Sequence, residues 1–313
     1  MSFIATKGRI AAIDIARGIA LVAMAIYHFT WDLEFFGWVL PGTSRQIGWL
    51  LFARAIASSF LILVGISLVL AHSEGIRWNG FWKRLAMVAA AAAAISLVTW
   101  FAVPDSFIFF GILHAIALFS LIAVFTVRLP WWINGVLALA VLMLSEALRS
   151  EALGAPWLYW LGLAPVNPAS NDYVPLFPWF SATLLGVAIG QFAKIRGWFE
   201  RIKGRFNGNR ADRSLGFIGR HSLAFYLIHQ PVLIGLIWLF TQVIGPPDQS
   251  VAFTTNCERT CVSNNDAAFC ERFCSCMLDE MKSEQIFTPF LEGKIDLETD
   301  EKGSDVLRYC SAR

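Results

Sequence analysis

The chain is poor in charged residues. Only 15% of its 313 residues are Asp, Glu, Lys or Arg, whereas 57% are hydrophobic, and the mean hydropathy is +0.58. Soluble domains contain about 25% charged residues, so this composition excludes an ordinary soluble protein and indicates a polytopic membrane protein. The basic residues are confined to short segments between apolar runs. This distribution argues against a nucleic-acid partner, which would require a basic face.

Cysteine is absent from the first 256 residues, and all six cysteines lie in the last part of the chain. The composition becomes polar at "IGPPDQ", and residues 246–313 contain 13 acidic and seven basic residues. An abrupt change of this kind marks a domain boundary. We therefore predict a transmembrane domain at residues 1–245 and a cysteine-rich tail at residues 246–313.

Seven apolar runs are long enough to cross about 30 Å of hydrocarbon. Asp14 and Arg17 interrupt the first run, which distinguishes it from a cleavable signal peptide. The sequence thus predicts an all-α fold, a polytopic membrane bundle of about seven transmembrane helices with a small, disulfide-rich helical tail. The runs lie near residues 10–30, 47–71, 83–102, 107–127, 131–149, 175–194 and 222–245.

The few lysines and arginines predict the orientation of the chain. The segment 194–220 has eight of them against two acidic residues. The other basic segments alternate along the chain so that they share its side of the membrane. By the positive-inside rule, this side is cytoplasmic. We expect a multipass inner-membrane protein with a cytoplasmic N-terminus and an extracytoplasmic tail. The other basic residues on that side are Lys7, Arg9, Arg77, Lys83 and Arg84.

The cysteine spacing in the tail is typical of two paired helices. Two Cys-x3-Cys pairs are separated by eight residues, and a four-residue step places both cysteines of a pair on one helical face. An even cysteine count in a small extracytoplasmic segment favours disulfides. A zinc site is the alternative, although zinc-binding pairs usually enclose two residues rather than three. The sequence does not fix the pairing, but two such helices can be joined by Cys257–Cys274 and Cys261–Cys270, with Cys276 and Cys310 left for a third bond.

The first apolar run carries ionisable residues along one face. At about 100° per residue, a stripe about 100° wide contains Asp14, Arg17, Gly18, His28 and Asp32. A charge at mid-helix costs roughly 2.5–3.5 kcal/mol on insertion scales, so the stripe must face the bundle interior or a water-filled cavity. Asp14 and Arg17 are three residues apart and can form an ion pair, which would explain their presence by structure instead of function.

His28 and Asp32 lie at the other end of this stripe, about 20–27 Å beyond Asp14. Asp32 follows His28 by one helical turn, so its carboxylate is placed to accept the ring N–H. This is the arrangement of a general base with an orienting carboxylate. The alternative is an interfacial histidine at position 28 that extends toward water.

Other apolar runs carry ionisable residues at a similar depth. Arg54 and His114 each lie about two turns from the outer end of their run, and His229 lies in the middle of the seventh. Ionisable residues within membrane spans mark functional sites. His229 precedes Gln230 and Pro231, so its alternative role is to bond a carbonyl group freed at a proline kink.

Five segments in order resemble a known family: "RIAAIDIARGIALVAMAIYHFTWDLEFFGW", "FLILVGISLVLA", "FFGILHAIALF", "PWFSATLLGVAIG" and "GRHSLAFYLIHQPVLIG". Together they are similar to bacterial relatives of heparan-α-glucosaminide N-acetyltransferase, a group of multipass membrane acyltransferases. The resemblance covers about residues 9–245 and leaves out the tail. Asp14-x-x-Arg17-Gly18 matches the opening motif of the family, whereas the animal enzyme has no histidine at the position of His28.

The resemblance implies that an acyl group, acetyl in this family, passes from cytoplasmic acyl-CoA to a sugar or glycan on the far side of the bilayer. Acyl-CoA is then a co-substrate, and no metal is predicted. Basic cytoplasmic segments suit its phosphates. The sequence leaves open whether the chain forms a homo-oligomer. The residues predicted to bind acyl-CoA are Asp14, Arg17, Arg77, Lys83 and Arg84.

Catalytic roles follow from combining this chemistry with the charged stripe. We expect His28 to act as general base, oriented by Asp32, and a protonated Arg54 to stabilise the oxyanion. His114 is expected to be a second base or a relay. Four outer tryptophans have two interpretations, stacking against a sugar or anchoring at the interface. They are Trp31, Trp38, Trp157 and Trp160.

Two other classes of function remain open. A proton-coupled transporter also needs ionisable residues inside its bundle, but the seven runs lack the internal repeat that many transporters have. A membrane anchor that displays the tail to a partner is the third class. The buried charges argue against the anchor, and the missing repeat argues against the transporter.

Overall fold

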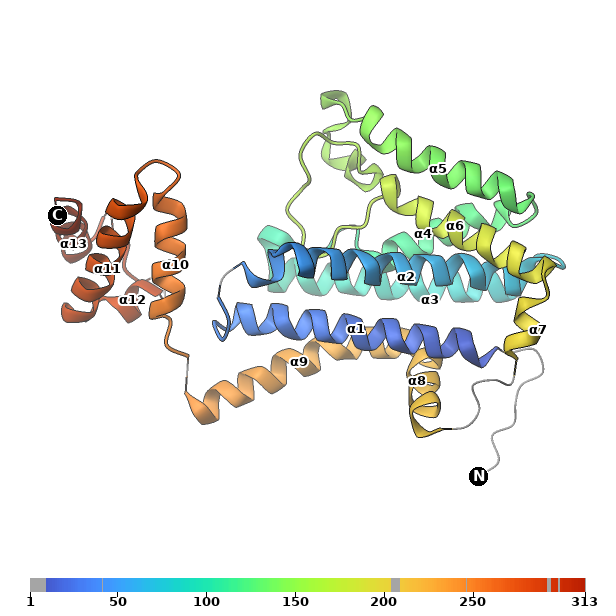
Figure 1. Cartoon of the computed structure of the whole chain (residues 1–313), viewed down its shortest axis with the longest axis horizontal. Coiled ribbons are helices and arrows are strands. Elements are labelled where there is room, and N and C mark those ends of the chain that lie inside the picture. Colours follow the sequence, from blue (N-terminus) through green and yellow to red (C-terminus); the bar gives the residue numbers. More distant parts are fainter. Residues whose placement is uncertain are drawn as a thin grey trace. The chain divides into compact units, whose positions relative to one another are not determined.

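The structure is a computed structural model that describes residues 10–40, 42–203, 209–245, 247–291, 294–297 and 299–312. Helices are its regular elements over these ranges, which confirms the all-α prediction. Each of the seven apolar runs forms one long helix (Figure 1). These helices are α1 (Ala11–Phe35), α2 (Ile47–His72), α3 (Trp78–Ala102), α4 (Ile112–Thr126), α5 (Trp131–Ala147), α6 (Leu176–Ile195) and α9 (Ser222–Ile244).

Five of the seven helices, α1, α2, α3, α6 and α9, are long and apolar enough to cross a membrane. The other two, α4 and α5, have 15 and 17 residues. Helix α4 is shorter than predicted because residues 107–111 are not helical. The backbone of Gly111 is extended and forms the N-cap, and the N–H group of Ile112 bonds to the Asp172 carboxylate at 2.8 Å instead of to a preceding carbonyl.

Helix α3 begins at Trp78, five residues earlier than the predicted run. Lys83 and Arg84 therefore lie inside the helix, which corrects their placement in the preceding link. The physical reason is the aromatic first turn. Trp78 and Trp82 stack at 6.1 Å, and Phe81 packs edge-on against both. Such rings are favoured at a membrane interface, where basic side chains can extend toward water.

Short helices occupy the connections and the tail. The 3-10 helices are η1 (Thr43–Arg45), η2 (Pro104–Ser106), η3 (Glu151–Leu153) and η4 (Pro156–Leu161). The short α-helices are α7 (Trp198–Ile202), α8 (Arg210–Arg220), α10 (Ser250–Cys261), α11 (Ala267–Ser283), α12 (Phe287–Leu291) and α13 (Glu301–Ser311). Helix α8 is capped by Asn209, whose side-chain oxygen accepts the N–H of Asp212 at 2.7 Å.

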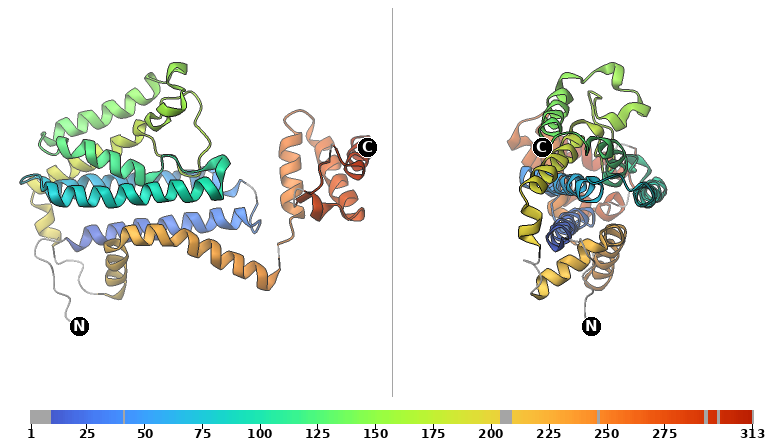
Figure 2. Two further views of the ribbon diagram at one scale, coloured as in Figure 1. Left: turned by 180° about the vertical axis from the view of Figure 1, so that it is seen from behind. Right: turned by 90° about the vertical axis from the view of Figure 1, so that its right-hand side faces the viewer.

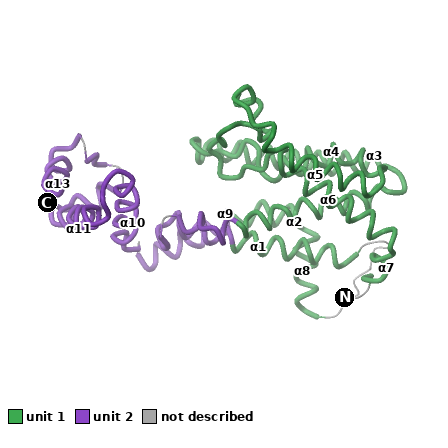
Figure 3. The backbone as a smooth tube through the Cα atoms, turned by 45° about the horizontal axis from the view of Figure 1, so that its top comes forward, with its two compact units in different colours: residues 1–26, 51–230 green, residues 27–50, 231–313 purple. Residues whose placement is uncertain are grey.

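The chain divides into two compact units (Figure 3). The first contains residues 1–26 and 51–230, and the second contains residues 27–50 and 231–313. The second unit thus combines the tail with the last part of α1, the first turn of α2 and the last part of α9. Each unit is described by itself below.

In the first unit, α5 packs along α6, and α4 lies between α3 and α6 (Figures 1 and 2). Its core contains Leu61, Phe119 and Leu184, all fully buried. Helices α2 and α6 approach closely at Gly65, where a Cβ atom would lie 2.2 Å from the carbonyl oxygen of Thr183. Small residues permit such approaches between membrane helices, where packing replaces the hydrophobic driving force.

Polar side chains join three connections at one end of the first unit. Lys194, at the end of α6, donates to Ser73 at 2.8 Å, beyond the end of α2. Gln191 donates to the carbonyl groups of Val127 and Leu129, between α4 and α5. The connections that follow α2, α4 and α6 therefore meet at this end of the first unit. Lys7, Arg9 and Arg205 lie outside the described residues.

The tail forms a small helical module with its own core. Cα–Cα distances of 5.6–5.8 Å join Cys257 to Cys274, Cys261 to Cys270 and Cys276 to Cys310, so the predicted disulfide pairing is confirmed. The zinc alternative is wrong, since these bonds use all six cysteines. The core of the module contains Met277, Met281, Phe287 and Val306.

Candidate functional site

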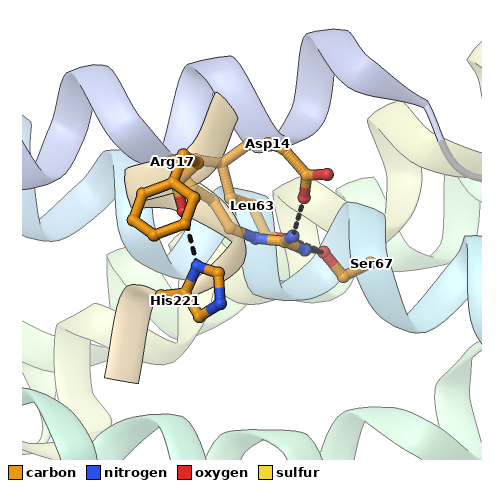
Figure 4. Close-up of polar contacts among 6 residues, drawn as sticks. Asp14, Arg17, Leu63, Ser67 and His221 are labelled. Atoms are coloured by element: carbon orange, nitrogen blue, oxygen red, sulfur yellow. Dashed lines mark hydrogen bonds and ion pairs between the residues drawn. The ribbon is translucent and has the colours of Figure 1, made fainter. Parts of the chain in front are cut away.

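Asp14 and Arg17 form an ion pair in the first turns of α1 (Figure 4). The two side chains are 3.1 Å apart, and Asp14 is only 4% exposed. Arg17 also donates to the hydroxyl of Ser67 on α2, and that hydroxyl donates to the carbonyl group of Leu63. The predicted ion pair is thus present, and Ser67 is a partner that the sequence analysis missed.

Gly18, the last residue of the same motif, has a packing role. A Cβ atom there would lie 2.2 Å from the carbonyl oxygen of Leu215 on α8. Helix α8 therefore crosses α1 at Gly18, one residue after Arg17. This contact brings the basic helix α8 to the same end of the first unit as the ion pair.

A cavity of about 340 Å³ lies at the junction of α2, α3 and α4. Arg77 and Arg84 line it, together with His72 and Phe81. His72 Nδ1 accepts the backbone N–H of Arg77 at 3.3 Å, which holds the turn between α2 and α3. Lys83 is exposed and does not line this cavity. The structure therefore brings two of the four basic residues predicted to bind acyl-CoA together at this cavity. The volume of the cavity lies within the range of small-molecule pockets.

His28 and Asp32 lie on the part of α1 that belongs to the second unit. Asp32 is fully buried at 0% exposure, whereas His28 is half-buried and its ring contacts that of Tyr27 at 5.8 Å. Both side chains have further interactions. One turn of continuous helix separates them, as predicted, so the chain holds a buried carboxylate one turn from an accessible imidazole.

His114 has hydrogen-bonding partners at both ring nitrogens, one at the start of α4 and one on α3. Its Nδ1 accepts the N–H of Gly111 at 3.2 Å, and its Nε2 lies 3.1 Å from the hydroxyl of Ser96. That hydroxyl donates to the carbonyl group of Ile108 at 2.6 Å, so the ring proton is on Nε2. His114 is thus neutral in this arrangement, and its basic nitrogen is already occupied by a backbone N–H.

Arg54 has a different environment from His114. Its side chain is exposed on α2. The hydrogen bonds described above for Ser96 and His114 do not include Arg54.

Asp172, which the sequence analysis did not select, is the centre of a second polar cluster. Its carboxylate accepts the N–H of Ile112 at 2.8 Å and the hydroxyl of Tyr226 on α9 at 3.5 Å. Asp172 lies in the connection before α6, and burial raises the pKa of its carboxyl while these bonds partly oppose the rise. A lone acid directly before the apolar run "YVPLFPWF" was the available sequence signal.

The bonds of Asp172 tie three distant segments together. The neighbouring Val174 N–H donates to the carbonyl group of Phe110 at 3.0 Å, so the connection before α6 pairs with the connection before α4. Backbone that leaves the helix inside a membrane bundle must find such partners, because lipid offers none. Asp172 therefore holds the start of α4, and with it His114, in place.

The remaining polar residues have structural partners. His229 Nδ1 lies 2.6 Å from the carbonyl oxygen of Tyr226, three residues earlier on α9. This is not the carbonyl group that Pro231 frees, which is that of Leu227. Trp38 donates its indole N–H to Thr241 at 3.1 Å, and Trp31 stacks on Phe35 at 5.7 Å. Trp157 is 76% exposed. No group of three metal-ligating side chains occurs in the described ranges.

Comparison with known proteins shows the family to which the chain belongs. The family model described as heparan-alpha-glucosaminide N-acetyltransferase, catalytic, matches residues 9–231, which include the Asp14–Arg17 pair, the cavity and the Asp172 cluster. No curated protein and no solved structure matches the chain. The match covers more than two thirds of the 313 residues, and it implies a membrane acetyltransferase. The chain therefore belongs to the family of the heparan-alpha-glucosaminide N-acetyltransferase catalytic domain.

Proposed function

We propose that this protein transfers an acetyl group from cytoplasmic acetyl-CoA to a hydroxyl or amino group of an extracytoplasmic sugar or glycan. The observation that carries the proposal is the family match over residues 9–231. It spans both the buried ion pair at the start of α1 and the cavity lined by Arg77 and Arg84. The orientation follows from the positive-inside rule, which assigns the basic end of the first unit to the cytoplasm.

The donor site in this proposal is the basic end of the first unit. Arg77 and Arg84 at the cavity supply positive charge for the phosphates of CoA. Arg17 keeps a fixed position because Asp14 and Ser67 hold its guanidinium. Lys83 is exposed next to the cavity wall, so its contribution is a longer-range attraction.

The chemical step is attack of the acceptor on the thioester carbonyl. His28 takes the proton from the acceptor O–H or N–H as the new O–C or N–C bond forms. The tetrahedral intermediate collapses, the C–S bond breaks, and the CoA thiolate leaves and takes up the proton. Asp32 accepts the other ring N–H and stabilises the imidazolium. The buried position of Asp32 suits this orienting role.

His114 and Arg54 have different proposed roles in this reaction. The lone pair of His114 Nδ1 already accepts a backbone N–H, so we assign the base to His28 and give His114 a positioning role at the start of α4. Arg54 remains the proposed oxyanion stabiliser, because it is the arginine within the spanning part of α2.

The test is acetyl transfer by the purified full chain in liposomes, with acetyl-CoA on one side and a panel of sugars on the other. We expect turnover by the wild type and a loss of at least a hundredfold in His28→Ala, the usual range for removing a general base. His221→Ala is the matched control, because it removes an exposed imidazole whose Nδ1 contacts the carbonyl group of Phe217 in the preceding helix α8. Size exclusion and thermal unfolding verify the fold of each variant.

The other outcomes decide between the rival functions. Equal activity in His28→Ala and wild type would show that a residue other than His28 is the general base. Absence of any CoA binding or turnover, together with substrate-dependent proton flux, would replace the enzyme by a proton-coupled transporter. Label retained on the protein from acetyl-CoA without acceptor indicates an acyl-enzyme, and its absence indicates direct transfer.

A further inference from the structure

The second unit contains a pocket of about 410 Å³ that the acyl-transfer scheme does not use. The end of α1 and the following turn form one wall, with Glu34, Phe35 and Gly37. Helix α10 forms the other wall, and Phe290 of α12 closes it. The pocket therefore connects the disulfide-linked tail to the end of the helix that carries His28 and Asp32.

The lining combines aromatic rings with neutral polar groups. Phe35, Phe253 and Phe290 supply apolar surface, and the rings of Phe253 and Phe290 are perpendicular at 6.1 Å. Gln249, Asn256 and Thr260 supply amide and hydroxyl groups along α10 and the residue before it. An aromatic surface beside amides and a hydroxyl suits a ring that has C–H faces and a rim of hydroxyls.

The charge of the pocket restricts the ligand further. Glu34 is the charged residue among its lining side chains. Its two oxygens accept the N–H groups of Gly42 and Ser44 at 2.6 and 2.7 Å, so the carboxylate is ionised and held in place. Residues 246–313 also contain 13 acids against seven bases. Arg259, which donates to the lining residue Asn256, balances part of this negative charge. The pocket therefore favours neutral or weakly cationic ligands over strongly charged ones.

The tail disulfides make the pocket a preformed one. Cys257 lies in the pocket wall, and its bond to Cys274 fixes α10 against α11. Phe253 packs against Phe287 in the core of the same module at 5.6 Å. A rigid wall reduces the entropy that a ligand loses on binding.

We infer that this pocket binds one or two sugar rings of a neutral or amino-sugar acceptor and thereby presents the glycan to the transferase. The inference rests on the proposed function for its role in catalysis but not for binding itself. It gives the cysteine-rich tail a task, which is to recognise the acceptor.

The experiment measures binding of three disaccharides to the full chain in nanodiscs without acetyl-CoA. The probes are chitobiose with free amines, its diacetylated form and a sulfated disaccharide. Ala252→Trp fills the pocket, and we expect it to weaken binding more than tenfold. Asn256→Ala removes one hydrogen-bonding group, and we expect a three- to tenfold loss. Thr255→Ala is the matched control, since its hydroxyl bonds to the carbonyl group of Val251 within α10 and it does not line the pocket.

Each result has a defined meaning. Binding of the first two probes that depends on Ala252 and Asn256 supports the inference. Equal binding by all variants, tighter binding of the sulfated probe, or no binding at millimolar concentration overturns it. If the wild type binds the probes in this pocket but transfers no acetyl group, the pocket is a sugar-binding site and the proposed function is wrong. If Ala252→Trp transfers acetyl groups with an unchanged KM for the acceptor, the proposed function is supported and the pocket is not the acceptor site.

Discussion

The membrane helices of the first unit and the tail helices α10–α13 are both all-helical, but different interactions hold them together. The membrane helices use close backbone approaches, as at Gly65, and a few polar bonds such as Arg17 to Ser67. The tail uses three disulfides and a small core around Met277 and Met281. The difference shows how the surrounding solvent decides which interactions a helix pair needs.

Lipid and water make opposite demands. In lipid, burial of apolar side chains gives little driving force, so tight packing and satisfied polar groups must hold the helices. In water, a segment of about 60 residues buries too little apolar surface for a stable fold and requires crosslinks. Cysteine is accordingly restricted to the tail, while the first unit has none.

The largest effect is expected from Gly65→Val in the first unit. The added Cβ atom would lie 2.2 Å from the Thr183 carbonyl oxygen and 2.6 Å from the nitrogen of Val187, and these are backbone atoms that cannot rotate away. Overpacking against side chains typically costs about 1–3 kcal/mol and occasionally more. Here the backbones of α2 and α6 would have to separate, so we expect a larger loss of stability than from removing one disulfide. We expect little folded protein by size exclusion and loss of the thermal transition.

Gly135→Ala on α5 is the control for this close approach. Nothing lies within 4 Å of a Cβ atom there, so the variant should be as stable as the wild type or more stable, by up to about 1 kcal/mol. A folded Gly65→Val protein with unchanged stability would contradict the view that backbone contact holds α2 and α6 together.

The second prediction concerns the tail. Replacing Cys276 and Cys310 by Ser should destabilise the module by about 2–5 kcal/mol, because this bond closes the longest loop, with a separation of 34 residues. Replacing Cys261 and Cys270, which are nine residues apart, should cost about 1 kcal/mol less in the chain-entropy account.

Limited proteolysis followed by mass spectrometry measures this effect separately for the two regions. Cleavage should increase within residues 250–312, and the first unit should keep its protection. If the first unit became equally sensitive, the two regions would not be independently stabilised, and the comparison above would fail.

The smallest effect is expected from Asp172→Asn. Burial raises the pKa of Asp172 in the folded protein, so the folded state favours the protonated form. Its stabilising contribution is therefore complete below the ordinary aspartate pKa of about 4 and is lost as the pH rises toward the folded value. Asparagine can still accept the N–H of Ile112, but it does not titrate.

Thermal unfolding between pH 4 and pH 8 checks this sign. The stability of the wild type should fall relative to Asp172→Asn as the pH rises. Asp105→Asn, at an exposed acid in η2, is the control and should follow the wild type. Parallel curves for the wild type and Asp172→Asn would show that burial of this carboxyl carries no pH-dependent cost.

Most of the fold could be predicted from local patterns. Hydrophobic length indicates the seven long helices. The Cys-x3-Cys spacing indicates that two tail helices each carry two cysteines on one face, which favours disulfides but does not fix their pairing. The Asp14–Arg17 pair follows from a three-residue step on one helix. The start of α4 could not be predicted, because a carboxylate 60 residues away accepts the N–H of Ile112.

The sequence by itself determined what depends on neighbours within one helix: the spans, the charged stripe of α1, the His28–Asp32 step and the helical face on which the cysteines of each Cys-x3-Cys pair lie. Only the tertiary structure decided which segments meet. It brings Ser67 to Arg17, places Arg77 and Arg84 at one cavity without Lys83, and ties Asp172 to Tyr226. The physical reason is that periodicity encodes the face on which a residue lies, whereas packing between helices selects the residue that faces it.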